Sequence, residues 1–159
     1  MTPILRVFVV LIVIIFFVFI ILQTRYKLLR LWKDVSVKEV VFHRLLQETA
    51  IVFYEQKNLF DLEEYKAALK KVYRYKKQKV RYLLLQERRE LYANLNSLYR
   101  SIEDEEDPKY KVVKKVFQDL QKARRVYNSK VLIYNQTITM FPTRYFAIKL
   151  NLKIKEYFG

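Results

Sequence analysis

The 159-residue sequence contains no cysteine, one glycine and three prolines. Without cysteine the chain can form no disulfide, no thiolate metal site and no cysteine nucleophile. A single glycine excludes the glycine-rich phosphate loops, the dinucleotide-binding fingerprint and the G-x-S-x-G turn of hydrolases. It also leaves little room for tight turns that need a positive φ, so the composition favours long helices.

Side chains suited to metal or acid–base chemistry are also scarce. His43 is the only histidine, and Glu39 lies four residues before it on one face of a predicted helix. One Glu and one His are too few for a metal cage, and the E-x-x-H pair of di-iron bundles does not occur. We therefore predict no cofactor, no metal site and no enzymatic activity.

Positive charge is present in excess. Thirty-one Lys and Arg residues face sixteen Asp and Glu residues, which gives a formal net charge of +15. Such a surface attracts phospholipid, nucleic acid or an acidic protein, and the charge alone does not choose among these partners.

Residues 7–22 form an unbroken apolar run, VFVVLIVIIFFVFIIL. With Ile4 and Leu5 included, a helix of this length rises about 28 Å, close to the roughly 30 Å core of a bilayer. A secretory signal peptide is the alternative, but its apolar region is usually shorter and ends in a small-residue cleavage site, which this run lacks. We therefore expect residues 1–24 to form an uncleaved transmembrane anchor and residues 25–159 to form a helical bundle domain.

The charges that flank the run predict its orientation. Arg6 and the amino terminus precede it, whereas a juxtamembrane basic cluster follows it, made up of Arg25, Lys27, Arg30 and Lys33. Positive residues favour the cytoplasmic side, so the N-terminus is predicted outside and the bundle domain in the cytoplasm. The same cluster attracts anionic headgroups at roughly 1 kcal/mol per residue, which makes the lipid bilayer the first expected partner.

Apolar spacing predicts further helices at about residues 25–58, 62–103, 109–141 and 143–157. Asp61 with Glu64 resembles a capping box at the start of the second helix, and the acidic block before Pro108 ends it. The tail after residue 147 alternates apolar and polar residues as a strand does. A lone strand would have no partner, so a short helix broken near Asn151 is favoured. The predicted fold is all-α: a transmembrane helix followed by an antiparallel, coiled-coil-like bundle of long helices.

The helix predicted over 109–141 carries a heptad seam. Its members are Tyr110, Val113, Phe117, Leu120, Arg124, Tyr127, Val131, Tyr134, Ile138 and Phe141. Tyr127 and Tyr134 are interpreted as core residues, with a recognition strip for a partner helix as the alternative. Asn128 and Asn135 follow them by one position, where their amides are expected to bond a neighbouring helix and fix the register.

One position of the seam is charged. Arg124 stands where the heptad pattern expects an apolar residue, so it should pair with a carboxylate or extend to solvent. Any exposed part of the seam would pair between protomers, so a homo-oligomer is one expected partner state.

The segment from Ala123 onward resembles the C-terminal signature of the LemA family. The matching pieces are ARRVYN at 123–128, YNQTI at 134–138, Phe141-Pro142, Ala147 and Tyr157-Phe158. The likeness is strong over about residues 110–158. The first half lacks the family's Ala-Trp and Ile-Pro-Asn stretch, and the family's Gly-Phe pair falls at Asn151-Leu152, where asparagine can still cap a helix.

The resemblance implies a single-pass, membrane-anchored helical bundle, and no catalytic residues carry over from it. The motif and packing residues that it marks are Ala123, Arg124, Arg125, Tyr127, Asn128, Tyr134, Asn135, Ile138, Phe141 and Pro142.

A second surface of interest lies between residues 66 and 81, which carry eight positive charges with interleaved tyrosines and no acid. Such basic–aromatic surfaces can bind phosphate and stack bases, but no nucleic-acid-binding motif accompanies this one, so nucleic acid is not the expected partner. A solvated helix face, or a patch for lipid or acidic proteins, is the favoured interpretation. The candidate anion-binding residues are Lys70, Lys71, Arg74, Lys76, Lys77, Lys79 and Arg81.

The sequence as a whole predicts a non-enzymatic scaffold or interaction module at the membrane, whose protein partners it does not identify. The alternative is an anionic-surface binder that uses residues 66–81.

Overall fold

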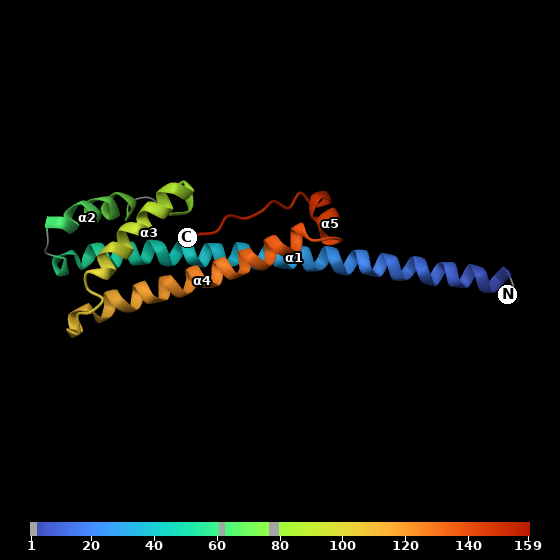
Figure 1. Ribbon diagram of the computed structural model, residues 1–159, viewed down its shortest axis with the longest axis horizontal. Helices are drawn as coiled ribbons and strands as arrows, with labels where there is room; N and C mark the ends of the chain where they lie inside the picture. Colours follow the sequence, from blue (N-terminus) through green and yellow to red (C-terminus); the bar gives the residue numbers. More distant parts are fainter. Residues whose placement is uncertain (1–2, 61–62, 77–79) are drawn as a thin grey trace. The chain divides into compact units, whose positions relative to one another are not determined.

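The computed structural model describes residues 3–60, 63–76 and 80–159, and the side chains of all of these except residues 5, 6, 63, 64, 75 and 76 (Figure 1). The α-helices are α1 (Pro3–Glu55), α2 (Glu63–Lys76), α3 (Leu85–Arg100), α4 (Lys111–Thr139) and α5 (Thr143–Lys149). Short 3₁₀ turns occur at η1 (Lys57–Leu59), η2 (Val80–Tyr82) and η3 (Pro108–Tyr110). No strand occurs among the described residues, which confirms the predicted all-helical class.

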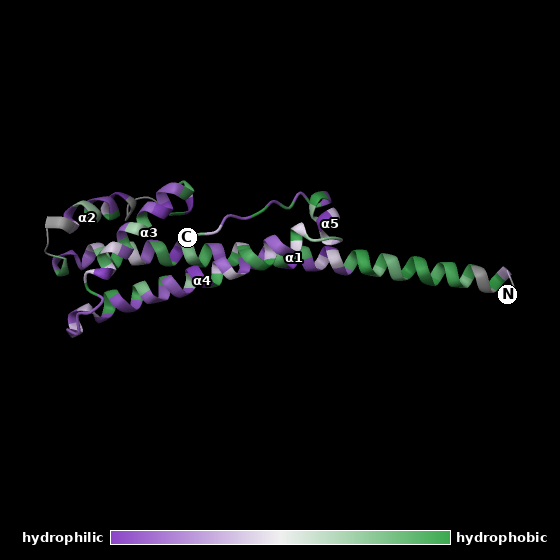
Figure 2. Cartoon of the chain, in the orientation of Figure 1, coloured by the Kyte–Doolittle hydropathy of each residue, from purple (hydrophilic) through white to green (hydrophobic). Residues whose placement is uncertain are grey.

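Helix α1 contains the whole apolar run and continues through Ser36 without interruption. The side chains of residues 7–22 are between 39% and 66% exposed, and none of the most apolar stretch of α1 is buried. Figure 2 shows this stretch as the continuous hydrophobic end of the helix. By length and composition, α1 can therefore cross a membrane.

The chain divides into two compact units. Unit 1 comprises residues 1–35 and 130–156, and unit 2 comprises residues 36–129 and 157–159. The buried side chains of unit 1 are Leu28, Val35, Val131, Tyr134, Asn135, Ile138 and Ala147. The core of unit 2 is larger, and its fully buried members include Phe42, Leu46, Phe53, Leu91, Leu95, Leu98 and Phe117.

The single helix predicted over 62–103 is wrong, because α2 and α3 are separate helices with η2 between them. Leu84 precedes α3 with an extended backbone (φ −62°, ψ 155°), and its N–H donates to the Glu87 carboxylate at 2.9 Å. Glu87 thereby caps the start of α3. The break leaves α2 and α3 packed against each other, and the predicted start at Asp61 lies outside the described residues.

Several apolar residues that follow helical spacing within 62–103 are buried on both sides of this break. Val72 of α2, Val80 of η2 and Leu91 of α3 are each at most 1% exposed. The spacing therefore predicted which side chains enter the core, although it did not predict the backbone that carries them.

The predicted seam of the fourth helix is buried at Val113, Phe117, Leu120, Tyr127, Val131, Tyr134 and Ile138. The seam ends earlier than predicted, because α4 ends at Thr139 and Phe141 is 92% exposed. Phe141 and Pro142, which are joined by a cis peptide bond, form the turn into α5.

Helix α5 ends at Lys149, so the helix predicted over 143–157 is too long. Asn151 has a positive φ of 51°, and the Leu152 N–H donates to the Ala147 carbonyl at 2.9 Å. These are the features of a Schellman cap, and they confirm the predicted break near Asn151. Residues 152–159 then continue without helical structure.

Candidate functional site

The asparagine of the first Tyr-Asn pair holds the C-terminal end of the chain. The Asn128 amide nitrogen donates to the Phe158 carbonyl at 2.7 Å, and the Phe158 N–H donates to the Asn128 amide oxygen at 2.8 Å. One side chain therefore satisfies both main-chain groups of one residue, as a neighbouring strand would.

The second pair repeats this arrangement within unit 1. The Asn135 amide donates to the Lys155 carbonyl at 2.8 Å and accepts from the Lys155 N–H at 2.9 Å. The fully buried Tyr134 adds a third bond, since its hydroxyl donates to the Lys153 carbonyl at 2.9 Å. Burial raises the pKa of the Tyr134 hydroxyl, so it keeps its proton and remains a donor at neutral pH.

We call these contacts of Asn128, Tyr134 and Asn135 with residues 153–158 the tail clasp. Asn128 makes its two bonds within unit 2, whereas Tyr134 and Asn135 make theirs within unit 1. The expectation that these amides bond a neighbouring helix is therefore wrong, because they bond an extended tail.

Phe158 anchors the end of the tail in the core of unit 2. Its side chain is 3% exposed, and its ring centroid lies 4.6 Å from that of Phe42 and 5.7 Å from that of Tyr92. The Arg89 guanidinium donates to the neighbouring Tyr157 carbonyl at 3.1 Å. Tyr157 and Phe158 are therefore fixed in two ways: the Phe158 ring packs in the core, and the main-chain carbonyls of both residues accept hydrogen bonds.

A chain of packed rings, which we call the aromatic cluster, extends from this anchor through unit 2. Tyr127 stacks on Phe42 at 5.9 Å, which agrees with the interpretation of Tyr127 as a core residue. Phe117 contacts Tyr92 at 6.0 Å and Tyr99 at 4.5 Å. Phe53 continues the cluster towards Phe60.

Arg124 lies over this cluster. Its guanidinium carbon is 4.8 Å from the centroid of the Tyr92 ring, a cation–π contact that partly offsets the cost of removing the charge from water. Its Nε is buried without a hydrogen-bond partner. Burial raises the pKa of Tyr92, although the positive charges of Arg124 and Arg125 act in the opposite direction. Arg124 therefore lies over an aromatic face, which differs from both environments expected for it, a carboxylate partner or solvent.

The other motif residues differ in environment. Ile138 is buried and Ala123 is partly buried, whereas Arg125, Phe141 and Pro142 are exposed. The motif as a whole thus combines core residues with exposed ones, and its two asparagines connect α4 to the tail.

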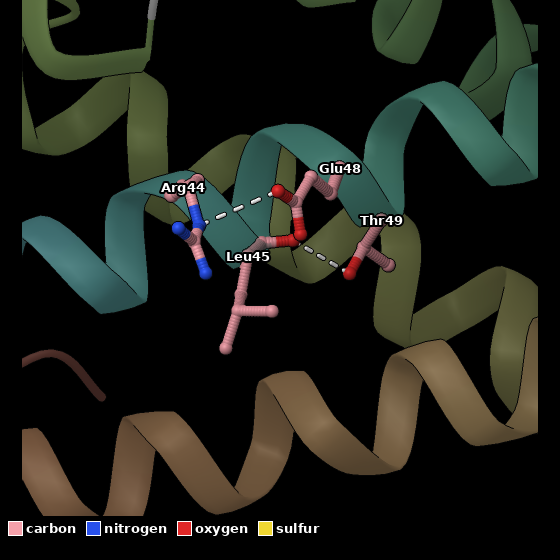
Figure 3. A network of polar contacts seen from close by, with 4 residues as sticks. All are labelled: Arg44, Leu45, Glu48 and Thr49. Carbon is pink, nitrogen blue, oxygen red and sulfur yellow. Dashed lines mark hydrogen bonds and ion pairs between the residues drawn. The ribbon is translucent and has the colours of Figure 1, made fainter.

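Two polar contacts of α1 in unit 2 join residues four apart on the helix itself. The Arg44 Nε lies 3.4 Å from a Glu48 carboxylate oxygen, and the buried Thr49 hydroxyl donates to the Leu45 carbonyl at 2.7 Å. Figure 3 shows both contacts on α1. Elsewhere on this helix, His43 contacts the Arg88 guanidinium through Nε2. Among the described residues, no group of three or more His, Cys, Asp or Glu side chains is placed to hold a metal ion.

The basic face of α2 is accessible where it is described. Lys70, Lys71 and Arg74 are exposed, while Val72 on the opposite side of the helix is fully buried. Arg81 is exposed as well and lies 4.6 Å from the ring of Tyr82. The Lys76 side chain, Lys77 and Lys79 lie outside the described part of the structure.

The juxtamembrane basic cluster is exposed on α1 at all four positions, Arg25, Lys27, Arg30 and Lys33. The next charged residue, Asp34, pairs with Lys130 of α4 at 2.8 Å within unit 1. The four cations of the cluster precede this ion pair and take no part in it.

Comparison with known proteins adds no assignment to this geometry. No family model, no curated protein and no solved structure matches the chain.

Proposed function

We propose that the chain is a single-pass membrane protein whose helical bundle serves as a non-enzymatic interaction module, or scaffold, at the membrane surface. The observation that carries this proposal is the apolar run of α1, which is exposed along its whole length. Burying an apolar side chain of this size is worth about 1.5–3 kcal/mol, so such a run is strongly favoured in lipid over water.

The finer architecture of the proposal is an antiparallel, coiled-coil-like bundle. Its support is the order of the contacts between α1 and α4 in unit 2. Phe53 contacts Phe117, and Phe42, which is earlier in α1, contacts Tyr127, which is later in α4. Contacts in this reversed order are those of two helices that run in opposite directions.

The LemA resemblance is part of the same proposal. It is supported by the structural role of its most distinctive residues, since Asn128, Asn135 and Phe158 all belong to contacts that fix the tail. A module of this kind would act by binding other proteins, which its exposed surfaces would select.

Membrane insertion is tested by alkaline carbonate extraction of membranes that carry the full chain. We expect the protein to remain in the membrane pellet, and its complete release would contradict the proposal. For orientation, a reporter fused after Phe158 should be active only in the cytoplasm, because the basic cluster follows the apolar run. Activity outside would show that the flanking charges do not set the topology.

Self-association is the least constrained part of the proposal. The heptad seam is largely buried, so a contact between copies would need other apolar residues that α4 exposes, such as Leu132 and Ile133 at 45% each. Cross-linking in membranes at several protein densities tests this. Monomer at every density would exclude a homo-oligomer.

The alternative is an anionic-surface binder through residues 66–81. The exposed side chains of Lys70, Lys71 and Arg74 on one face of α2 favour it. Binding to anionic vesicles or DNA should then weaken steeply as salt rises, and a variant with all three residues changed to glutamine should bind less. Equal binding by that variant and the unmodified chain at low salt would rule this alternative out.

A further inference from the structure

A groove opens between α1 and α5 within unit 1. It has a volume of about 480 Å³ and is lined by Ile21, Arg25, Tyr145, Phe146, Lys149 and Leu150. Ile21 belongs to the apolar run, and Arg25 is the first charged residue after that run. The groove therefore begins on apolar side chains and ends on charged ones.

The charges in and around this groove are strongly biased. Both charged residues of its lining, Arg25 and Lys149, are cations. By sequence, unit 1 contains ten Lys and Arg residues and two acids, Asp34 and Glu156. Asp34 is already paired with Lys130 at 2.8 Å, so the potential at the groove is positive.

Helix α5, which lines the groove, and the turn before it expose apolar side chains. Phe141, Tyr145 and Ile148 are 92%, 58% and 69% exposed, and Met140 is 62% exposed. The Lys149 ammonium lies 5.3 Å from the centroid of the Tyr145 ring. Tyrosine, exposed apolar side chains and lysine on a short helix are the combination found where a protein meets the headgroup region of a membrane.

We propose that this groove binds one anionic phospholipid of the bilayer. The phosphate lies between Arg25 and Lys149, and an acyl chain follows Ile21, Phe146 and Leu150 towards the hydrocarbon core. This inference rests on the proposed membrane anchor, because the end of the apolar run sets the groove at the level of the headgroups. The loss of one cation beside an anionic headgroup weakens binding about fivefold.

The test uses the full chain in neutral detergent, incubated with mixed micelles that contain equal amounts of phosphatidylglycerol and phosphatidylcholine. Native mass spectrometry then counts the lipids retained. We expect one phosphatidylglycerol per chain in preference to phosphatidylcholine, and about fivefold less of it on the Lys149→Gln variant. Lys149→Arg should restore retention, because it returns the positive charge to the same place.

Lys153→Gln is the matched control. It removes the same charge four residues later, from an exposed position outside the groove, and should leave retention unchanged. Three results would overturn the proposal: equal retention of the two lipids, equal losses in the two glutamine variants, or displacement of the lipid by inorganic phosphate alone. Carbonate extraction separates the two levels of inference. Release of the chain from membranes contradicts the anchor, whereas an inserted chain without lipid preference contradicts only the groove.

Discussion

The tail clasp makes a sharp prediction about Asn128. Its amide pairs with both the N–H and the carbonyl of Phe158, at 2.8 and 2.7 Å. Asn128→Ala leaves both groups without these partners in a partly buried place, where each lost bond costs about 1–3 kcal/mol. A total near 2.7 kcal/mol corresponds to about a hundredfold shift towards the released tail.

Hydrogen exchange measured residue by residue on the full chain reports this opening directly. The Phe158 N–H should exchange about a hundredfold faster in Asn128→Ala than in the unmodified chain. The Leu152 N–H should stay protected, because it bonds to Ala147. Ser129→Ala, which changes the exposed neighbour of Asn128, serves as the control and should leave Phe158 unaffected.

An aspartate at this position separates hydrogen bonding from side-chain shape. Asn128→Asp keeps an acceptor for the Phe158 N–H but cannot donate to the Phe158 carbonyl while it is ionised. Protection of the Phe158 N–H should therefore fall at neutral pH, but by less than in Asn128→Ala, because one of the two bonds remains. It should recover as the pH falls below about 3.9, where a free aspartate gains a proton and can donate again. Unchanged exchange at Phe158 in both variants would refute the clasp.

Further predictions concern the cap, the core and alkaline pH, all measured on the full chain in detergent micelles. Because φ is 51° at residue 151, Asn151→Gly should leave the free energy of unfolding unchanged or raise it, and Asn151→Ala should lower it by about 1 kcal/mol. A denaturant titration in which the alanine variant is more stable than the glycine variant would contradict the Schellman cap. Leu95→Ala, at a fully buried position, should lower the free energy of unfolding by about 2–5 kcal/mol in the same titration. Burial raises the pKa values of Tyr92 and Tyr134 above the usual 10.0, so their contribution to stability is complete below pH 10 and is lost as pH rises through the folded-state values. Thermal midpoints measured between pH 8 and 11 should fall less in Tyr92→Phe, and an identical fall in both chains would show that this titration does not matter.

The helical class and the identity of the core could be predicted because both depend on residue spacing. Val113, Phe117 and Leu120 are buried where the heptad pattern placed them. The break between α2 and α3 could not be found in this way. It depends on a hydrogen bond from the Leu84 N–H to Glu87, and a glutamate in an apolar stripe has the same spacing whether it caps a helix or interrupts one.

The partners of Asn128 and Asn135 could not be predicted for a different reason. The sequence identified Asn128 and Asn135 as a repeated pair and Asn151 as a left-handed cap. The heptad context points to a neighbouring helix as the partner of the asparagines. Separately, the strand-like alternation of the tail has no evident strand partner, which points to a short helix there. The partner is a set of side chains on α4, and no periodicity in the tail alone reveals partners of that kind. The alternation of residues 148–154 was the available signal, since it is typical of extended chain.

The tail clasp has a consequence for how freely this protein can change. Asn128, Tyr134 and Asn135 bond only main-chain groups of the tail, so the identities of the side chains at 153 and 155 do not enter these bonds. The spacing of the two tail residues in unit 1 does enter them, because the adjacent Tyr134 and Asn135 bond Lys153 and Lys155. Substitutions at 153 and 155 should therefore be tolerated, whereas an insertion or deletion between them should not. At Phe158, by contrast, both the bonded main chain and the buried ring constrain the sequence.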